Sequence, residues 1–272
     1  MSAASFNPEY VLHSDEEPLR LERQARIYGG ADDLRFLRPA ATGCILDAGC
    51  GSGSAARAIA RAVPQARVTG IDREPKYIDF ARRQAAAEGL ENAEFVTGDV
   101  LELPFQDGSF DQVWSKHLLQ WVGGRQQALN EFRRVTQPGG RIVCCNFDGF
   151  CVVHFPTDER LQAEMERWFA AAREAFGFDN ELGRKLPHYF RRAGLVDVRV
   201  DFIPDRAFCG FGGDPERRWN WETQFRSALP FTAQVMGGEK AALDFNRRAV
   251  ERFSDPEVYV HCALFYVEGT VP

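Results

Sequence analysis

The sequence predicts an α/β fold in which helices cover both faces of a mainly parallel, doubly wound sheet. Short apolar runs alternate with helical stretches between residues 44 and 147, and this alternation is typical of βαβ units. Right-handed crossovers between parallel strands place the helices on both faces of the sheet. The chain has 272 residues, of which 44% are hydrophobic and 26% charged, so it is long and apolar enough to bury a sizeable core.

Each element of this region is indicated by a local pattern. Apolar runs bounded by turn residues predict the strands, and an alanine-rich stretch after a glycine-rich turn predicts the first helix. Pro75 suits the first turn of a helix, and the Gln-Pro-Gly-Gly sequence at 137–140 ends another. The expected strands are 44–48, 67–71, 93–97, 110–114 and 141–147, and the expected helices are 54–63, 75–88 and 124–135.

The flanking regions add helices and two late strands. A capping residue and an acidic first turn predict a helix at 15–28. Residues 157–176 carry apolar side chains at helical spacing, which predicts a long amphipathic helix. A helix at 182–193 and a strand at 196–203 follow, then several helical pieces within 204–257 and a strand at 258–267.

Composition and charge exclude several classes of protein. Lys and Arg number 33 against 39 Asp and Glu, a net charge of −6, which argues against a broad nucleic-acid-binding surface. The N-terminus lacks a secretory pattern, and no apolar run approaches the roughly 18 residues of a membrane span. The seven cysteines are scattered without Cys-x-x-Cys or zinc spacing, so we expect reduced, buried thiols, no metal site and a cytoplasmic location.

The strongest chemical signal is the segment ILDAGCGSGSAARAIA at 45–60. A strand runs into Asp47, and Gly49, Gly51 and Gly53 then alternate with other residues before a helix begins. Glycine permits positive φ and a close approach of the backbone to a ligand, and the N–H groups at the helix start favour a polar or anionic group. A simple strand-to-helix turn is the alternative.

Two acids extend this pattern into a resemblance to a known family. Asp72 ends the second strand (VTGID) and Asp99 follows the third (FVTGD). With the Asp-x-Gly-x-Gly-x-Gly spacing, they resemble the class I S-adenosylmethionine-dependent methyltransferases that act on small molecules. The resemblance covers about residues 44–147 and implies a Rossmann-like, seven-stranded sheet whose last strand is antiparallel. The glycine spacing differs from the G-x-G-x-x-G of NAD-dependent oxidoreductases.

The resemblance implies a set of cofactor contacts. Asp72 lies where a carboxylate accepts two hydrogen bonds from a ribose diol, and Asp99 and the Val100 N–H would meet the adenine. Asp99 could instead cap the following turn, and Asp47 could orient the glycine loop or the ligand's ammonium group. The full set expected to bind S-adenosylmethionine is Tyr10, Arg20, Asp47, Gly49, Cys50, Gly51, Gly53, Asp72, Arg73, Gly98, Asp99, Val100, Ser115 and Lys116.

The N-terminal segment carries a further resemblance to this family. Tyr10 and the pattern Glu17-x-x-Arg20-Leu-x-x-Gln24 are similar to the opening of small-molecule methyltransferases, in which the segment folds over the cofactor. A guanidinium suits a carboxylate, so Arg20 would pair with that of the methionine moiety. The alternative is an amphipathic helix with a solvated Arg20.

The sequence indicates the acceptor and the catalytic group less clearly than it indicates the cofactor contacts. Methyl transfer is an in-line displacement that depends on proximity and on exclusion of water, and a base helps when the acceptor is a hydroxyl. His117, just past the fourth strand, is the candidate base. The residues expected to bind a bulky, partly apolar acceptor are His117, Trp121, Phe150, His154, Trp168, Trp219 and Trp221. These aromatic side chains could instead pack a helical cap or form a homodimer interface.

Phenylalanine is concentrated in the second half of the chain. We therefore expect a single domain, 1–272, whose segments have different functions. We expect a helical lid at 1–43, a cofactor-binding core at 44–147, helical cap insertions at 148–182 and 204–257, and completion of the sheet by 183–203 and 258–272. A cyclase that binds the cofactor without methyl transfer would carry the same cleft. An RNA or protein methyltransferase fits the acidic charge less well.

Overall fold

A computed structural model describes residues 14–28, 31–204, 208–209 and 214–272 of the chain, which are built around one mixed sheet. The strand order is β3-β2-β1-β4-β5-β8-β6, and β8 pairs antiparallel with both β5 and β6. The predicted α/β fold with an antiparallel last strand is confirmed. The strands are β1 (Thr42–Ala48), β2 (Gln65–Asp72), β3 (Ala93–Thr97), β4 (Phe110–Lys116), β5 (Thr136–Phe155), β6 (Val196–Pro204) and β8 (Tyr259–Thr270). The two-residue β7 (Phe208–Cys209) also pairs with β8, so the sheet has one strand more than predicted.

The position of the ligand-binding cleft follows from the strand order. The chain proceeds outward from β1 to β2 and β3, then returns to place β4 on the other side of β1. In open α/β sheets, ligands bind beside the carboxyl ends of the strands at such a reversal. The loops after β1, β2 and β4 therefore meet at one edge of the sheet.

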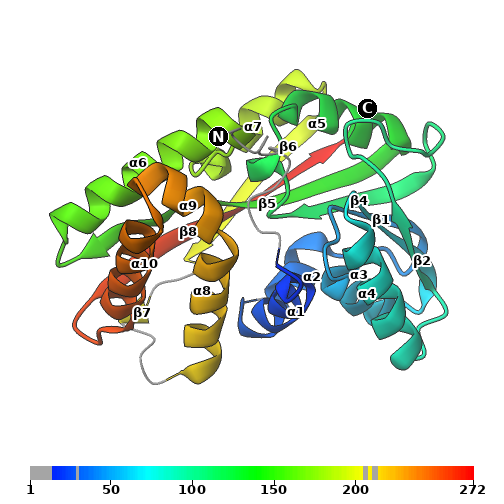
Figure 1. Ribbon diagram of the computed structural model, residues 1–272. Helices are drawn as coiled ribbons and strands as arrows, with labels where there is room; N and C mark the ends of the chain where they lie inside the picture. Colours follow the sequence, from blue (N-terminus) through cyan, green and yellow to red (C-terminus); the bar gives the residue numbers. More distant parts are fainter. Residues whose placement is uncertain (1–13, 29–30, 205–207, 210–213) are drawn as a thin grey trace, which may run out of the picture.

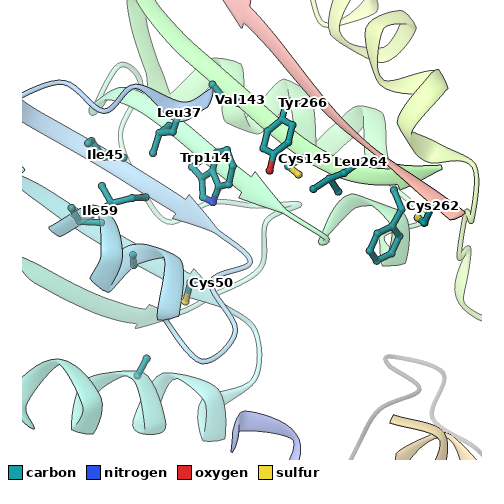
Figure 2. Packing of buried hydrophobic residues seen from close by; sticks show 14 of the residues in the cluster. Leu37, Ile45, Cys50, Ile59, Trp114, Val143, Cys145, Cys262, Leu264 and Tyr266 are labelled. Atoms are coloured by element: carbon teal, nitrogen blue, oxygen red, sulfur yellow. The ribbon is translucent and has the colours of Figure 1, made fainter. Parts of the chain in front are cut away.

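Helices cover both faces of the sheet, as right-handed crossovers require (Figure 1). One apolar cluster joins the sheet to α2 (Ala31–Leu37), α3 (Ser54–Ala62) and α4 (Pro75–Ala87), and a second joins it to α5 (Arg125–Val135) and α7 (Leu182–Arg192). Figure 2 shows Trp114, Cys145 and Tyr266, from three adjacent strands, on the first of these faces. Five cysteines carry free thiols, and burial raises the pKa of two of them, Cys50 and Cys144; the five are Cys44, Cys50, Cys144, Cys145 and Cys262.

The strand β5 is longer than the sequence predicts. It continues past residue 147 to Phe155 because its end pairs with β8 again, at Val153–His261 through Phe155–Tyr259, after an irregularity in the register. The first part of the 148–182 segment is therefore strand and not helix. The helix α6 (Glu159–Phe176) begins only at Asp158, whose carboxylate accepts the Leu161 N–H at 2.9 Å as an N-cap.

Helices α8 (Pro215–Ser227), α9 (Leu229–Met236) and α10 (Glu239–Ser254) form the last large segment before β8 and lie together beside the far ends of β5 and β8 (Figure 1). A third apolar cluster joins α6 to α9 through Phe176, Phe178 and Phe231. The helix α1 (Glu17–Tyr28) lies against α8 and α3. Of the described helices, none has both the length and the apolar character needed to cross a membrane.

Candidate active site

A cavity of about 720 Å³ lies where the loops after β1, β2 and β4 meet, and it continues beneath α1, α6, α8 and α9. At one end its walls are the glycine-rich loop and the acids at the ends of β1 and β2. At the other end they are aromatic side chains, most of which belong to the second half of the chain. The cavity therefore joins the two regions that the sequence separates by composition.

The glycine-rich loop is held against β2 by its own backbone. The N–H groups of Gly49 and Cys50 donate to the Ile71 carbonyl at 2.8 and 2.9 Å, and the Gly51 N–H donates to Asp72 Oδ2 at 2.9 Å. Gly51 has a φ of 53°, and a Cβ there would stand 3.2 Å from Leu21 of α1. The loop needs glycine because it turns sharply directly beneath this helix.

Gly53, the last of the three glycines in the loop, lies where α3 meets its neighbours. It does not line the cavity. It has a φ of 76°, and a Cβ at this position would stand 2.6 Å from Ala81 and 2.7 Å from Phe95. Gly53 allows α3 to pack closely on α4 and β3, and its contact with the cofactor stays a prediction.

Asp47 presents a buried carboxylate oxygen to the cavity. The residue is 2% exposed, and its Oδ2 makes no hydrogen bond within the described part of the chain. Burial, together with the negative charges of Asp72 and Asp33, raises the pKa of Asp47 to about 7. The nearby Lys116 Nζ contacts both oxygens of Asp33, at 2.8 and 2.7 Å. A positively charged ligand group would therefore be stabilised beside Asp47.

Asp72 and Asp99 both line the cavity, and each also supports its own loop. Asp72 accepts the N–H groups of Gly51 at 2.9 Å and Glu74 at 3.1 Å, and burial raises its pKa. Asp99 accepts the Leu101 N–H at 2.9 Å, which is the turn-capping role left open by the sequence. Each carboxylate still has lone pairs for a further donor.

Most of the other predicted cofactor residues also lie on the cavity wall. These are Arg20, Gly49, Cys50, Gly51, Arg73, Gly98, Val100 and Lys116. Arg20 is 2% exposed and contacts Glu17 through two nitrogens, at 2.8 and 2.5 Å, as well as Asn220 of α8 at 3.1 Å. It is therefore not the solvated arginine of the alternative reading. Ser115 is 1% exposed within the sheet and does not line the cavity, and Tyr10 lies outside the described residues.

His117 lies on the cavity wall directly after β4. Its φ of 57° is unusual for a residue with a side chain, and its N–H donates to the Cys145 carbonyl at 2.8 Å. The imidazole stacks on Phe147, with ring centres 4.2 Å apart. The backbone turn and this stacking fix the direction of the ring beside the cavity.

Trp121, Trp168 and Trp221 line the aromatic end of the cavity. Trp121 packs on Phe178 with ring centres 4.3 Å apart, and the Trp168 indole N–H donates to Thr232 Oγ1 at 3.0 Å. These side chains belong to the loop after β4, to α6 and to α8. The three tryptophans predicted to contact the acceptor therefore come together at one end of the cavity.

Two other predicted acceptor residues, Trp219 and His154, do not line the cavity, and their contact with an acceptor stays a prediction. The guanidinium carbon of Arg23 lies over the Trp219 ring, 4.2 Å from the ring centre. His154 is 5% exposed, and its Nε2 accepts the Asp158 N–H at 3.3 Å. Its ring meets the edge of Phe253. The side chain of Phe150 lies outside the described part of the structure.

The structure also adds cavity residues that sequence reasoning missed. Asp33, Gln120, Phe178 and Gln224 all line the cavity. Gln120 stands alone in the apolar run Leu118-Leu119-Gln120-Trp121-Val122, and a polar residue in that position is the signal that could have indicated it. Asp33 and Phe178 have no comparable local signal, because distant strands and helices bring them to the site.

The chain resembles several characterised proteins. A family described as "Methyltransferase domain" matches residues 41–194. Demethylmenaquinone methyltransferase of Geobacillus kaustophilus (strain HTA426) is 32% identical over 167 residues, covering 57% of this chain and 71% of that protein. The solved phosphoethanolamine N-methyltransferase 2 of Haemonchus contortus, in complex with phosphomonomethylethanolamine and S-adenosylhomocysteine, has a TM-score of 0.62 at 16% identity. That comparison covers 98% of this chain and 60% of the nematode protein.

A third comparison shows how widely this fold is used. The [4+2]-cyclase SpnF has a TM-score of 0.56 at 20% identity, over 88% of this chain and 79% of that protein. At these identities the solved structures show a shared fold. The buried, unpaired oxygen of Asp47 and the glycine cradle at Gly51 fit a cofactor with a cationic end. On the family match and the shared strand arrangement, the chain belongs to the class I S-adenosylmethionine-dependent methyltransferases.

Proposed function

We propose that this enzyme methylates a small, bulky and largely apolar metabolite. The observation that carries the proposal is the continuity of the cavity from the glycine-rich loop to Trp121, Trp168 and Trp221. Pockets for small molecules are concave and mainly apolar, with a few polar groups that fix orientation. A cavity of about 720 Å³ has the size of a small-molecule site.

At the polar end, the chain's own residues would hold the cofactor. The Asp47 carboxylate would face the ammonium group, and Asp72 would accept hydrogen bonds from the ribose. When bound, S-adenosylmethionine supplies an activated methyl group on a sulfonium. Asp99 and Val100 also line the cavity and would contact the adenine.

At the aromatic end, the residues would align the acceptor and exclude water. Proximity and orientation of this kind contribute about 7–11 kcal/mol to lowering a barrier. His117 is the residue that would accept a proton from a hydroxyl acceptor, since its ring is held at the cavity wall by Phe147. An amine or carbon acceptor would not require that base.

Names of related proteins support this acceptor class. One relative is called a demethylmenaquinone methyltransferase, and a solved neighbour is a geranyl diphosphate methyltransferase. The site lies inside a cavity, and the net charge is −6, which favours a small molecule over RNA. A homodimer and a cytoplasmic location stay predictions.

The first experiment measures cofactor binding by calorimetry. Wild type should bind S-adenosylmethionine and S-adenosylhomocysteine, and Asp72→Ala should weaken both by about tenfold or more, because charged hydrogen bonds are lost. Asp79→Ala is the control, since Asp79 is an exposed acid of α4 and should bind like wild type. If wild type binds neither compound, the proposal fails.

The second experiment identifies the acceptor. Wild type is incubated with cofactor carrying a labelled methyl group and with small-molecule extract, and mass spectrometry then detects products that have gained one labelled methyl. Detection of a small molecule that has gained the labelled methyl group would support the proposal. Cofactor binding without transfer would instead favour the cyclase-like alternative.

A further inference from the structure

Gln120 is a buried polar residue at the aromatic end of the cavity. It is the middle residue of the 3-10 turn η1 (Leu119–Trp121) that follows β4. Its backbone carbonyl accepts the Asp179 N–H at 2.8 Å, which places Gln120 beside Phe178, the residue before Asp179. The side chain is part of the cavity wall, yet Gln120 is only 2% exposed.

One end of the Gln120 amide is held by a second buried amide. Asn146 of β5 is 1% exposed, and its Nδ2 donates to Gln120 Oε1 at 3.1 Å. Within the described residues, no hydrogen bond is made by Gln120 Nε2. The pairing therefore leaves the N–H₂ group of Gln120, a residue of the cavity wall, as a donor that a ligand could use.

The orientation of this pair follows from the cost of unsatisfied groups. As arranged, the atom of Asn146 without a described partner is its carbonyl oxygen, Oδ1. Turning both amides over would leave a buried Asn146 N–H₂ unsatisfied instead. Buried N–H groups without partners are rarer than under-satisfied carbonyls. The favoured arrangement presents a donor, not an acceptor, at the position of Gln120.

The surroundings of this donor define what would bind to it. Trp121 and Phe178 pack together at 4.3 Å, and Phe147 and Trp168 also line the cavity. A donor among aromatic side chains is costly without a partner, by about 1–3 kcal/mol. A ligand that supplied one neutral oxygen on an apolar, ring-containing body would satisfy the donor and fill the apolar space.

We propose that Gln120 is a specificity-determining residue that binds a carbonyl-type oxygen of the acceptor, and that Asn146 holds its amide in place. The acceptor class is thereby narrowed to a neutral, flat, apolar molecule that carries a hydrogen-bond-accepting oxygen. This inference rests on the proposed function, because it assigns the aromatic end of the cavity to the acceptor.

The test uses a matched pair of probes, 1-tetralone and tetralin, which share a ring skeleton and differ by one carbonyl oxygen. Their binding is followed by tryptophan fluorescence in the presence of saturating S-adenosylhomocysteine. Wild type should bind the ketone about fivefold to tenfold more tightly than the hydrocarbon. Gln120→Leu should abolish this preference and leave the affinity for tetralin within about twofold of wild type.

Gln120→Glu is a second variant that separates loss of the donor from a folding defect in Gln120→Leu. It retains an oxygen for Asn146 Nδ2 and removes the N–H donors. It should also lose the preference for the ketone. Gln162→Leu is the matched control, since Gln162 lies on α6 outside the cavity and contacts Glu166, and it should keep the preference.

The outcomes distinguish this inference from the proposed function. Failure of wild type to bind S-adenosylhomocysteine would overturn the proposed function. If wild type binds S-adenosylhomocysteine but shows no preference for the ketone, or binds neither probe, the role proposed for Gln120 is wrong. The same conclusion follows if both Gln120 variants retain the preference while binding S-adenosylhomocysteine normally.

Discussion

Asp47 shows how burial changes the chemistry of one residue. Its carboxyl group lies at the end of β1, and burial raises its pKa from 3.8 to about 7. In the unfolded chain this group loses its proton at much lower pH. Between these two pKa values, the native state binds more protons than the unfolded state, so the free energy of unfolding falls as pH rises.

Replacing Asp47 by Asn should remove this pH dependence. Between pH 5 and pH 8, in the absence of ligand, wild type should lose about 2 kcal/mol more unfolding free energy than Asp47→Asn. Urea unfolding at the two pH values measures the difference. Asp79→Asn, at an exposed site of α4, should behave like wild type. Equal pH dependence in Asp47→Asn and wild type would contradict the raised pKa.

At the scale of elements, a buried ion pair connects α1 to α3. Arg57 of α3 is 1% exposed and contacts Glu22 of α1 at 2.7 Å, Glu88 at 2.9 Å and the Ser52 carbonyl at 2.8 Å. Since α1 also covers the glycine-rich loop through Leu21, this contact holds one wall of the cavity in place.

Removing the guanidinium should loosen α1. Arg57→Ala should lower the free energy of unfolding by about 3–5 kcal/mol, because Glu22 loses a buried partner. Hydrogen exchange should accelerate in Glu17–Tyr28 more than in the strands. Arg61→Ala is the control, since Arg61 contacts the same Glu88 from an exposed position and should have little effect. Unchanged exchange in α1 would show that other contacts hold it.

The elements also show which patterns predict structure well. The strand at 93–97 has the predicted bounds, because its apolar pattern and turns are local. The end of β5 was missed because residues 148–155 become strand only by pairing with β8, over a hundred residues later. Two aromatic side chains of α8 show the same dependence on distant contacts. Trp221 lines the cavity, whereas Trp219 packs against Arg23 of α1.

For the whole molecule, the cavity couples distant segments, so ligand binding should stabilise the complete fold. Its wall includes residues of α1, the sheet loops, α6, α8 and α9. A ligand that binds only the native state adds about 2.7 kcal/mol at one hundred times its Kd.

Thermal unfolding checks this coupling. S-adenosylhomocysteine at one hundred times its Kd should raise the Tm of wild type by about 5–10 °C. At the same ligand concentration Asp72→Ala should show a smaller rise, in keeping with its weaker binding. An unchanged Tm for wild type, despite binding in calorimetry, would mean that the ligand does not distinguish native from unfolded chain.

The sequence by itself determined the α/β fold, the glycine-rich loop after β1 and the acids at the ends of β1 and β2 and after β3, because each depends on residues close together in the chain. Only the tertiary structure decided that Gly53 packs against Phe95, that His154 lies away from the cavity, and that Arg20 meets Asn220. It also joined Gln120 to Asn146. These contacts link residues from different elements, and the packing of those elements depends on the whole apolar core rather than on any local pattern.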